Sequence, residues 1–228
     1  LPIILVVSAF AALVASGGAP KASIAMGRGD NDEAERIIGS CLSFLIIISI
    51  VLSVVLVIWN RPMLLTFGAS ENTIDYASSY MTIYACGTIF VQMTLGMNAF
   101  ITAQGKTTIS MLTVVIGAVL NIILDPIFIF AFGMGVKGAA LATIMSQCVS
   151  SIWCIIFISG KKSLLRLKVK NMKIEHSLLF PCLALGISTF IMQSTESVIS
   201  VCFNSSLLKY GGDIAVGAMT ICTSVMQM

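Results

Sequence analysis

Long apolar runs separated by short polar stretches make up most of this chain. Cutting the chain at its charged residues leaves six segments close to or above the roughly 20 residues that a membrane-spanning helix needs, and a shorter seventh. None of them alternates with the period of two that a strand would show, so helices are predicted throughout. The segments are 1–19, 37–59, 76–104, 107–136, 138–159, 177–208 and 214–228.

Composition supports the same fold class. Hydrophobic residues make up 57% of the chain, charged residues only 10%, and the mean hydropathy is +1.02. A soluble domain carries roughly 25% charged residues, because its surface faces water. We therefore predict an all-α integral membrane protein. The first and last apolar runs have no polar flank, so we expect part of a longer polypeptide whose first run is a helix and not a signal peptide.

The basic residues predict the orientation. Ten of the thirteen Lys and Arg residues fall in the loops on one side, and three fall on the other. This asymmetry predicts that the ten-residue side is cytoplasmic, in a multi-pass protein of the bacterial plasma membrane. The smaller group is Arg61, Lys137 and Lys209. The larger group is Lys21, Arg28, Arg36, Lys106, Lys161, Lys162, Arg166, Lys168, Lys170 and Lys173.

Two cytoplasmic stretches have a predicted structural role. Asp30, Asp32 and Glu33 are expected to cap and charge the amino end of the helix that follows them. The basic stretch 159–174 is either an amphipathic segment at the membrane surface or a linker between two helical bundles. A connector attracted to anionic lipid would explain its charge.

Motifs of soluble enzymes are absent or out of context, so no enzyme activity is predicted. Gly133-Met-Gly135-Val-Lys-Gly138 matches G-x-G-x-x-G, but it follows a thirty-residue apolar run and no acid comes about 20 residues later. We interpret it as a glycine-rich outer turn. The seven cysteines all lie in apolar segments without a C-x-x-C pair, which favours buried packing over metal or disulfide roles.

One acid lies deep in an apolar run. Asp125 is the only charged residue between Thr107 and Val136. An ionised Asp near the middle of a spanning helix costs about 2.5–3.5 kcal/mol on insertion scales, so such a residue is a functional hypothesis by default. Asn121 lies four residues earlier, on the same helical face. Pro126 removes a backbone donor and should kink or locally unwind the helix, which suggests a cavity.

Helix direction and rise per residue predict the neighbours of Asp125. The acid lies about two turns below the outer end of its helix. The next helix runs inward and brings Thr143 and Gln147 to the same level, and the preceding helix brings Tyr80 and Tyr84. Glu196 is a second acid at membrane depth, preceded by Gln193, Ser194 and Thr195. Glu196 and Gln147 are therefore candidates for a second ion or substrate site.

Several of these stretches together resemble the multidrug and toxic compound extrusion (MATE) transporters. Asn121–Pro126 followed by Gly135–Thr143 resembles the fifth and sixth helices of that family. Residues 25–30 resemble its second cytoplasmic turn, and residues 96–105 resemble the end of its fourth helix. The resemblance spans essentially the whole chain.

The resemblance implies helices two to eight of a twelve-helix fold with two six-helix lobes. Residues 1–160 would form the amino-terminal lobe without its first helix, 161–175 the linker, and 176–228 the start of the carboxy-terminal lobe. It also implies antiport by alternating access, in which H⁺ or Na⁺ entry drives the export of organic cations. The matching ion-site residues are Tyr80, Asn121, Asp125 and Thr143, completed in the family by an acid on the first helix. Glu196 is the nearest counterpart of an acid that other members carry on the seventh helix.

The expected partners are small organic cations and membrane lipid, with no nucleic acid and no cofactor besides the coupling ion. The full-length protein is expected to work as a monomer. A lipid-linked oligosaccharide flippase of the same broad superfamily is an alternative, although its pyrophosphate substrate would need basic residues inside the helices. A channel, or a scaffold in which Asp125 only bonds a neighbouring helix, is the other alternative.

Overall fold

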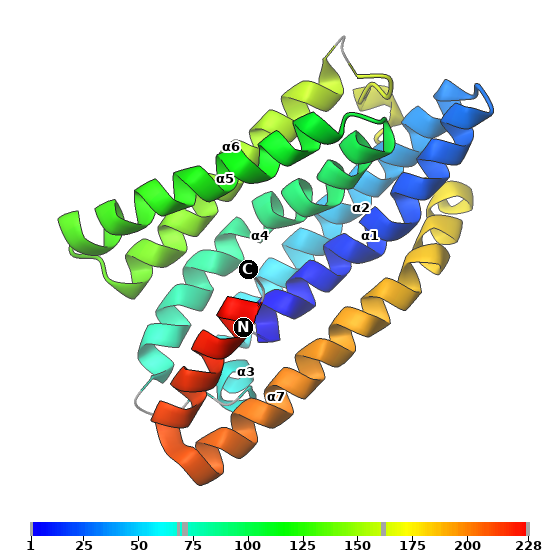
Figure 1. The fold of residues 1–228 in the computed structure, drawn as a ribbon. Helices are drawn as coiled ribbons and strands as arrows, with labels where there is room; N and C mark the ends of the chain where they lie inside the picture. Colours follow the sequence, from blue (N-terminus) through cyan, green and yellow to red (C-terminus); the bar gives the residue numbers. More distant parts are fainter. Residues whose placement is uncertain (1, 68, 70–72, 161–162, 227–228) are drawn as a thin grey trace.

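The computed structural model describes residues 2–67, 69, 73–160 and 163–226, and these residues form helices and connecting turns without a strand. Six helices are long and apolar enough to cross a membrane, and they run alongside one another (Figure 1). The elements are α1 (Pro2–Gly27), α2 (Asn31–Ile58), α3 (Asn60–Thr66), α4 (Ile74–Ala103), α5 (Thr107–Pro126), η1 (Ile127–Ala131), α6 (Val136–Ser159), η2 (Val169–Asn171) and α7 (His176–Met226).

The predicted helices are all present, but several boundaries differ. The first helix continues past Lys21 to Gly27, so only Arg28–Asp30 remain in the first inner turn. The predicted cap is confirmed, since the backbone N–H of Glu33 donates to the Asp30 carboxylate at 2.9 Å. We use inner and outer for the predicted cytoplasmic side and the opposite side.

The last predicted helices are joined without a loop. The structure continues α7 from His176 across Gly212, where a φ of 64° interrupts the helical backbone. The predicted sixth segment is thus the long part up to Gly212, and the predicted seventh is the short apolar helix Ile214–Thr223. Figure 1 shows the chain turning back at this point toward its amino terminus.

Helix α5 does not unwind after Pro126. The five residues Ile127–Ala131 form a π-helical turn instead, so the proline changes the hydrogen-bond pattern and the helical path continues. The glycine-rich stretch that follows is a turn, as predicted, because Gly133 and Gly135 have φ values of 62° and 56°.

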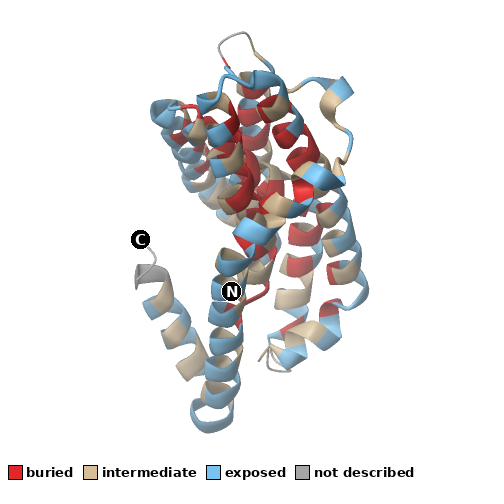
Figure 2. Cartoon of the chain, turned by 90° about the vertical axis from the view of Figure 1, so that its right-hand side faces the viewer, coloured by how far each residue is buried: buried red, intermediate tan, exposed pale blue. Residues whose placement is uncertain are grey.

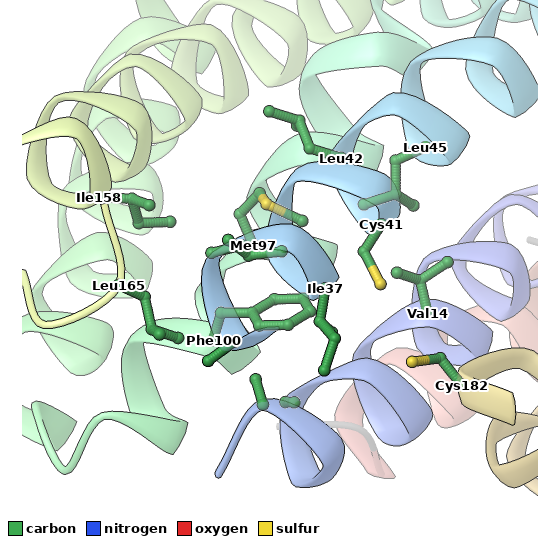
Figure 3. Close-up of a cluster of buried hydrophobic side chains, with 14 of the residues drawn as sticks. Val14, Ile37, Cys41, Leu42, Leu45, Met97, Phe100, Ile158, Leu165 and Cys182 are labelled. Carbon is green, nitrogen blue, oxygen red and sulfur yellow. The ribbon is translucent and has the colours of Figure 1, made fainter. Parts of the chain in front are cut away.

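The core lies where the inner halves of α1, α2 and α4 meet, and buried residues gather in that part of the molecule (Figure 2). Most of the surface of α5 and α7 is exposed. Apolar side chains at exposed positions, such as Ile122 and Phe180, are what a helix surface facing lipid requires. The largest buried cluster also draws side chains from α6, α7 and the basic stretch before α7 (Figure 3). Its labelled members in Figure 3 are Val14, Ile37, Cys41, Leu42, Leu45, Met97, Phe100, Ile158, Leu165 and Cys182.

The basic stretch between α6 and α7 is fastened to the inner end of α4. The side-chain oxygen Oε1 of Gln104 accepts hydrogen bonds from the Ser163 hydroxyl at 2.8 Å and the backbone N–H of Leu164 at 2.9 Å. It also accepts from the N–H of Leu165 at 3.4 Å, and the Leu165 side chain is fully buried in the core cluster. One buried amide therefore satisfies three donors of this stretch.

The same stretch is fastened to α2. The buried carboxylate of Glu35 forms an ion pair with Lys168 at 2.6 Å and accepts from the backbone N–H of Arg166 at 3.3 Å. The Ser40 hydroxyl donates to the carbonyl of Lys173 at 2.9 Å. These contacts favour a connector held on the helices over an amphipathic segment lying along the bilayer surface.

We predict that Gln104→Leu lowers the stability of the protein in detergent by roughly 1–3 kcal/mol, because the backbone N–H groups of Leu164 and of buried Leu165 lose their acceptor, whereas the Ser163 hydroxyl keeps the carbonyl of Leu165. Thermal unfolding followed by tryptophan fluorescence measures the change. Gln104→Glu keeps an acceptor oxygen and is the matched control, with a smaller loss. Equal melting temperatures for Gln104→Leu and the wild type would contradict the prediction.

Candidate functional site

The buried face of α5 is its polar face. Ser110, Thr113 and Gly117 are buried, and they recur at intervals of three and four residues, the spacing of one helical face. Asn121 and Asp125 continue this face and are partly buried, whereas Ile122 and Ile123 on the other side are exposed. The helix therefore turns its apolar side outward and its polar side toward α4 and α6, the arrangement expected for a polar site within a membrane.

Asp125 contacts Asn121 as predicted. The side-chain nitrogen Nδ2 of Asn121 donates to Oδ1 of Asp125 at 3.5 Å, a long hydrogen bond. Among the described residues, no basic side chain lies within ion-pair distance of Asp125. The carboxylate thus has one neutral partner and no counter-charge from the described part of the chain.

Tyr80 and Thr143 lie at the level of the acid, on α4 and α6. Tyr80 lies near Thr143 and close enough to Asp125 for an electrostatic interaction. The ring of Tyr80 stacks on the ring of Tyr84, with 6.2 Å between centroids. The structure therefore brings all four predicted ion-site residues into one region between α4, α5 and α6.

A cavity of about 230 Å³ extends from this region between the same three helices. Asn121, Thr143 and Gln147 line it together, so the predicted proximity of Gln147 to the other two residues is confirmed. The carbonyl oxygen Oε1 of Gln147 is buried and has no hydrogen-bond partner. Four further polar residues line the cavity that sequence reasoning did not identify: Thr94, Thr113, Ser146 and Ser150. On α5 and α6, these residues lie three or four positions from the next lining residue, and this spacing is the sequence signal that could have identified them.

Glu196 lies in a different cavity. This second cavity has a volume of about 210 Å³ and lies between α1 and the two parts of α7, with Ser200, Asn204 and Thr220 also in its wall. Gln147 is not part of it. The structure thus separates the two residues that the sequence grouped as candidates for a second site.

The turn after η1 positions α6 against the end of α5. A Cβ atom on Gly138 would lie 2.7 Å from the backbone carbon and oxygen of Phe128, closer than side chains tolerate. Only glycine therefore lets the first turn of α6 approach the π-helical turn that follows Asp125 and Pro126. In the part of the chain that the structure describes, no cluster of three or more His, Cys, Asp or Glu side chains could hold a metal ion.

We predict that Gly138→Ala displaces the π-helical turn and destabilises the protein by roughly 1–3 kcal/mol, as overpacking against rigid backbone does. The melting temperature in detergent provides the measurement. Gly217→Ala is the control, because a Cβ there meets no atom within 4 Å and Gly217 lies in regular helix. An unchanged melting temperature for Gly138→Ala would show that Phe128 can move at little cost.

Comparison with known proteins identifies the family of the chain. The family model MatE matches residues 1–127, more than half of the chain. The multidrug export protein MepA of Staphylococcus haemolyticus is 30% identical over 92% of this chain and 47% of its own length. MepA of Staphylococcus saprophyticus is 26% identical over the whole chain and 50% of its own length. The chain thus spans about half the length of these curated relatives.

A solved structure has the same fold. It is described as the inward-facing conformation of a multidrug resistance MATE family transporter of the MOP superfamily. The two structures superpose with a TM-score of 0.91 at 24% sequence identity, over 96% of this chain and 50% of the other. At this identity the likeness concerns the fold, and it agrees with the all-helical arrangement described above.

Proposed function

The chain belongs to the MatE family, and on that premise we propose that it takes part in secondary active export of small organic cations, coupled to the entry of H⁺ or Na⁺ at Asp125. It is a multi-pass plasma membrane protein, and its described residues contain six helices long enough to span a bilayer. Its relatives are named multidrug export proteins, which supports transport and not catalysis as its role.

The observation that carries the proposal is the surroundings of Asp125. An ionised carboxylate at this depth is unfavourable unless a cation or a proton neutralises it. Asn121, Thr143 and Tyr80 supply neutral amide and hydroxyl groups at the same level, and the described residues supply no basic partner. A site of this composition binds a proton or a small cation reversibly, because no permanent ion pair competes for the acid.

The distribution of charge favours cationic substrates. Among the described residues, Asp125 and Glu196 are the acids that lie away from the helix ends, whereas the other acids and the basic residues lie near helix ends or in connecting segments. Glu196 faces its own cavity, where it is placed to attract a cation. A pyrophosphate-linked lipid would meet negative charge there, which argues against the flippase alternative.

The coupling step follows from the helix geometry. Binding of the coupling ion removes the net charge of Asp125, and the π-helical turn directly after Pro126 is the part of the helix with the least regular hydrogen bonding. We expect this turn and its contact with Gly138 to shift when the charge is removed. A shift of α5 against α6 would then alter the substrate cavity, as alternating access requires.

We predict that Asp125→Asn abolishes ion-driven export, because an amide cannot carry the coupling charge. Efflux of a fluorescent organic cation from liposomes containing the full-length protein is measured under a pH gradient alone and under a Na⁺ gradient alone. The wild type should respond to at least one gradient, and the variant should lose at least tenfold in rate.

Asp32→Asn is the control, since Asp32 lies exposed in the first turn of α2 and should leave efflux unchanged. Export by Asp125→Asn at the wild-type rate would show that another group carries the ion. Ion currents without any link to substrate movement would instead indicate a channel.

A further inference from the structure

Two of the seven cysteines lie next to each other in the core cluster. Cys41 of α2 is 1% exposed, and Cys182 of α7 is fully buried. Cys41 lies near Cys182 and close enough for an electrostatic interaction between the two thiols. Figure 3 shows both side chains in the same buried cluster, beside Val14 of α1. The two cysteines are far apart in the sequence, so their proximity is a property of the fold.

Two consecutive glycines of α1 allow this approach. A Cβ atom on Gly18 would lie 2.9 Å from the sulfur of Cys41, closer than side chains tolerate. A Cβ atom on Gly17 would overlap the backbone carbonyl oxygen of Cys182. Helices α2 and α7 therefore reach the same level of α1, and each brings its cysteine there.

A positive charge lies beside the pair. Lys21 follows Gly17 by four residues, one turn along α1, and its side chain is half-buried. It lies close enough to Cys182 for an electrostatic interaction. Among the described residues, no carboxylate lies within ion-pair distance of Lys21. Its ammonium group can therefore compensate negative charge that develops on the sulfur atoms.

The position of the pair favours the thiol form over a disulfide. Cys41 lies ten residues after the start of α2, and Cys182 lies six residues after the start of α7, both toward the predicted cytoplasmic side. Cytoplasmic redox buffers keep thiols reduced. Two reduced thiols side by side are the ligand pair of a soft metal ion, because sulfur ligands select soft ions such as Cu⁺.

We propose that Cys41 and Cys182 form a two-coordinate site for a soft monovalent cation of the Cu⁺ and Ag⁺ class. Each thiol loses its proton to solvent and forms one metal–sulfur bond, so M⁺ and two R–SH give M(SR)₂⁻ and two H⁺ without a change of oxidation state. The complex carries one negative charge, which the ammonium group of Lys21 balances.

A bound ion would also link two parts of the chain. Cys41 belongs to the predicted amino-terminal lobe and Cys182 to the start of the predicted carboxy-terminal lobe. A metal bridge between their sulfur atoms fixes α2 to α7 at this level. The site lies in the inner core, apart from Asp125, and it needs no third ligand from the described residues.

The test measures binding of Cu⁺ to the purified, reduced full-length protein, by competition with the coloured Cu⁺ complex of bicinchoninate. Four exposed or partly exposed thiols are first removed to give the reference protein. We expect Cys41→Ala and Cys182→Ala each to weaken Cu⁺ binding by at least about 100-fold, because losing a direct ligand costs more than losing an outer partner. The four background changes are Cys86→Ala, Cys148→Ala, Cys202→Ala and Cys222→Ala.

Cys154→Ala is the matched control. Cys154 is also fully buried, but its thiol donates to the hydroxyl of Thr113 at 3.7 Å. Its replacement should leave Cu⁺ binding unchanged. Melting temperatures show that each variant is folded, and Ag⁺ should raise the melting temperature of the reference protein but not that of Cys41→Ala, because the ion stabilises the form that binds it.

The role of Lys21 has its own readout. Lys21→Met should weaken Cu⁺ binding about tenfold, the effect of losing a partner outside the ligand shell, and Lys21→Arg should retain most of the affinity. X-ray absorption at the copper edge should show two sulfur neighbours in both the reference protein and Lys21→Met.

The proposal is overturned if the reference protein binds Cu⁺ no more tightly than Cys41→Ala or Cys182→Ala, or if Cys154→Ala weakens binding equally. A shell of three or more neighbours around the bound copper would contradict the two-coordinate site. A disulfide between Cys41 and Cys182 in the isolated protein, recognised by maleimide labelling only after reduction, would also overturn it. None of these measurements involves transport, so they stand apart from the ion coupling assigned to Asp125.

Discussion

The carboxylate of Asp125 lies in a helix whose other side chains are apolar or neutral. The packing around it lowers the free-energy cost of placing a charge at membrane depth. Lipid offers the charge no hydrogen bonds, so α5 turns its polar face toward α4 and α6 and its isoleucines outward. The neighbouring helices α4 and α6 place hydroxyl and amide side chains at the same level. The polar contacts between α4, α5 and α6 and the apolar outer surface of α5 follow from this one constraint.

Small residues make the arrangement possible. Helices in lipid gain little from burying apolar surface, so they approach closely where side chains are small and bond across the gap. Gly87 lies against Ile144, Gly117 against Ser150 and Gly138 against the backbone of Phe128. These contacts draw α4, α5 and α6 together along their length. The same closeness lets short hydroxyls on one helix reach the backbone carbonyls of the next, as Ser150 does with Thr113.

The sequence predicted the membrane spans and the depth of the site well, because hydropathy and rise per residue depend only on position along the chain and not on contacts between distant segments. Tyr80 and Thr143 were brought to the level of Asp125 by counting residues from the helix ends, and Asn121 by its spacing of four residues on the same helix, and the structure places them in one region. The lobe boundaries and the ionic role of these residues stay predictions. The cap at Asp30 was likewise visible, since it depends on neighbours along the chain.

What the sequence did not show depends on packing between distant segments. The charged residues after α6 suggested contact with lipid, yet Glu35 and Gln104 bind that stretch from helices far away in the sequence. Similarly, the sequence showed Gln147 and Glu196 only as two polar residues at membrane depth. The folded path of α7 is what places Glu196 in a different cavity from Gln147. The π-helical turn after Pro126 is a further case, because a proline alone does not determine how the next residues recover their hydrogen bonds.

The position of α4 links the two ends of the protein. Its inner end holds the connector through Gln104, and Tyr80 near its outer end lies beside Asp125. Helix α5 packs mainly on α6, and α6 in turn packs along α4. A change at the acid therefore acts first on the pair α5 and α6, while α4 stays anchored by the connector. In the proposed function, the outer part of α5 moves against α6 while the connector holds α4, and the close contact between Gly138 and the backbone of Phe128 is where that motion has the least room.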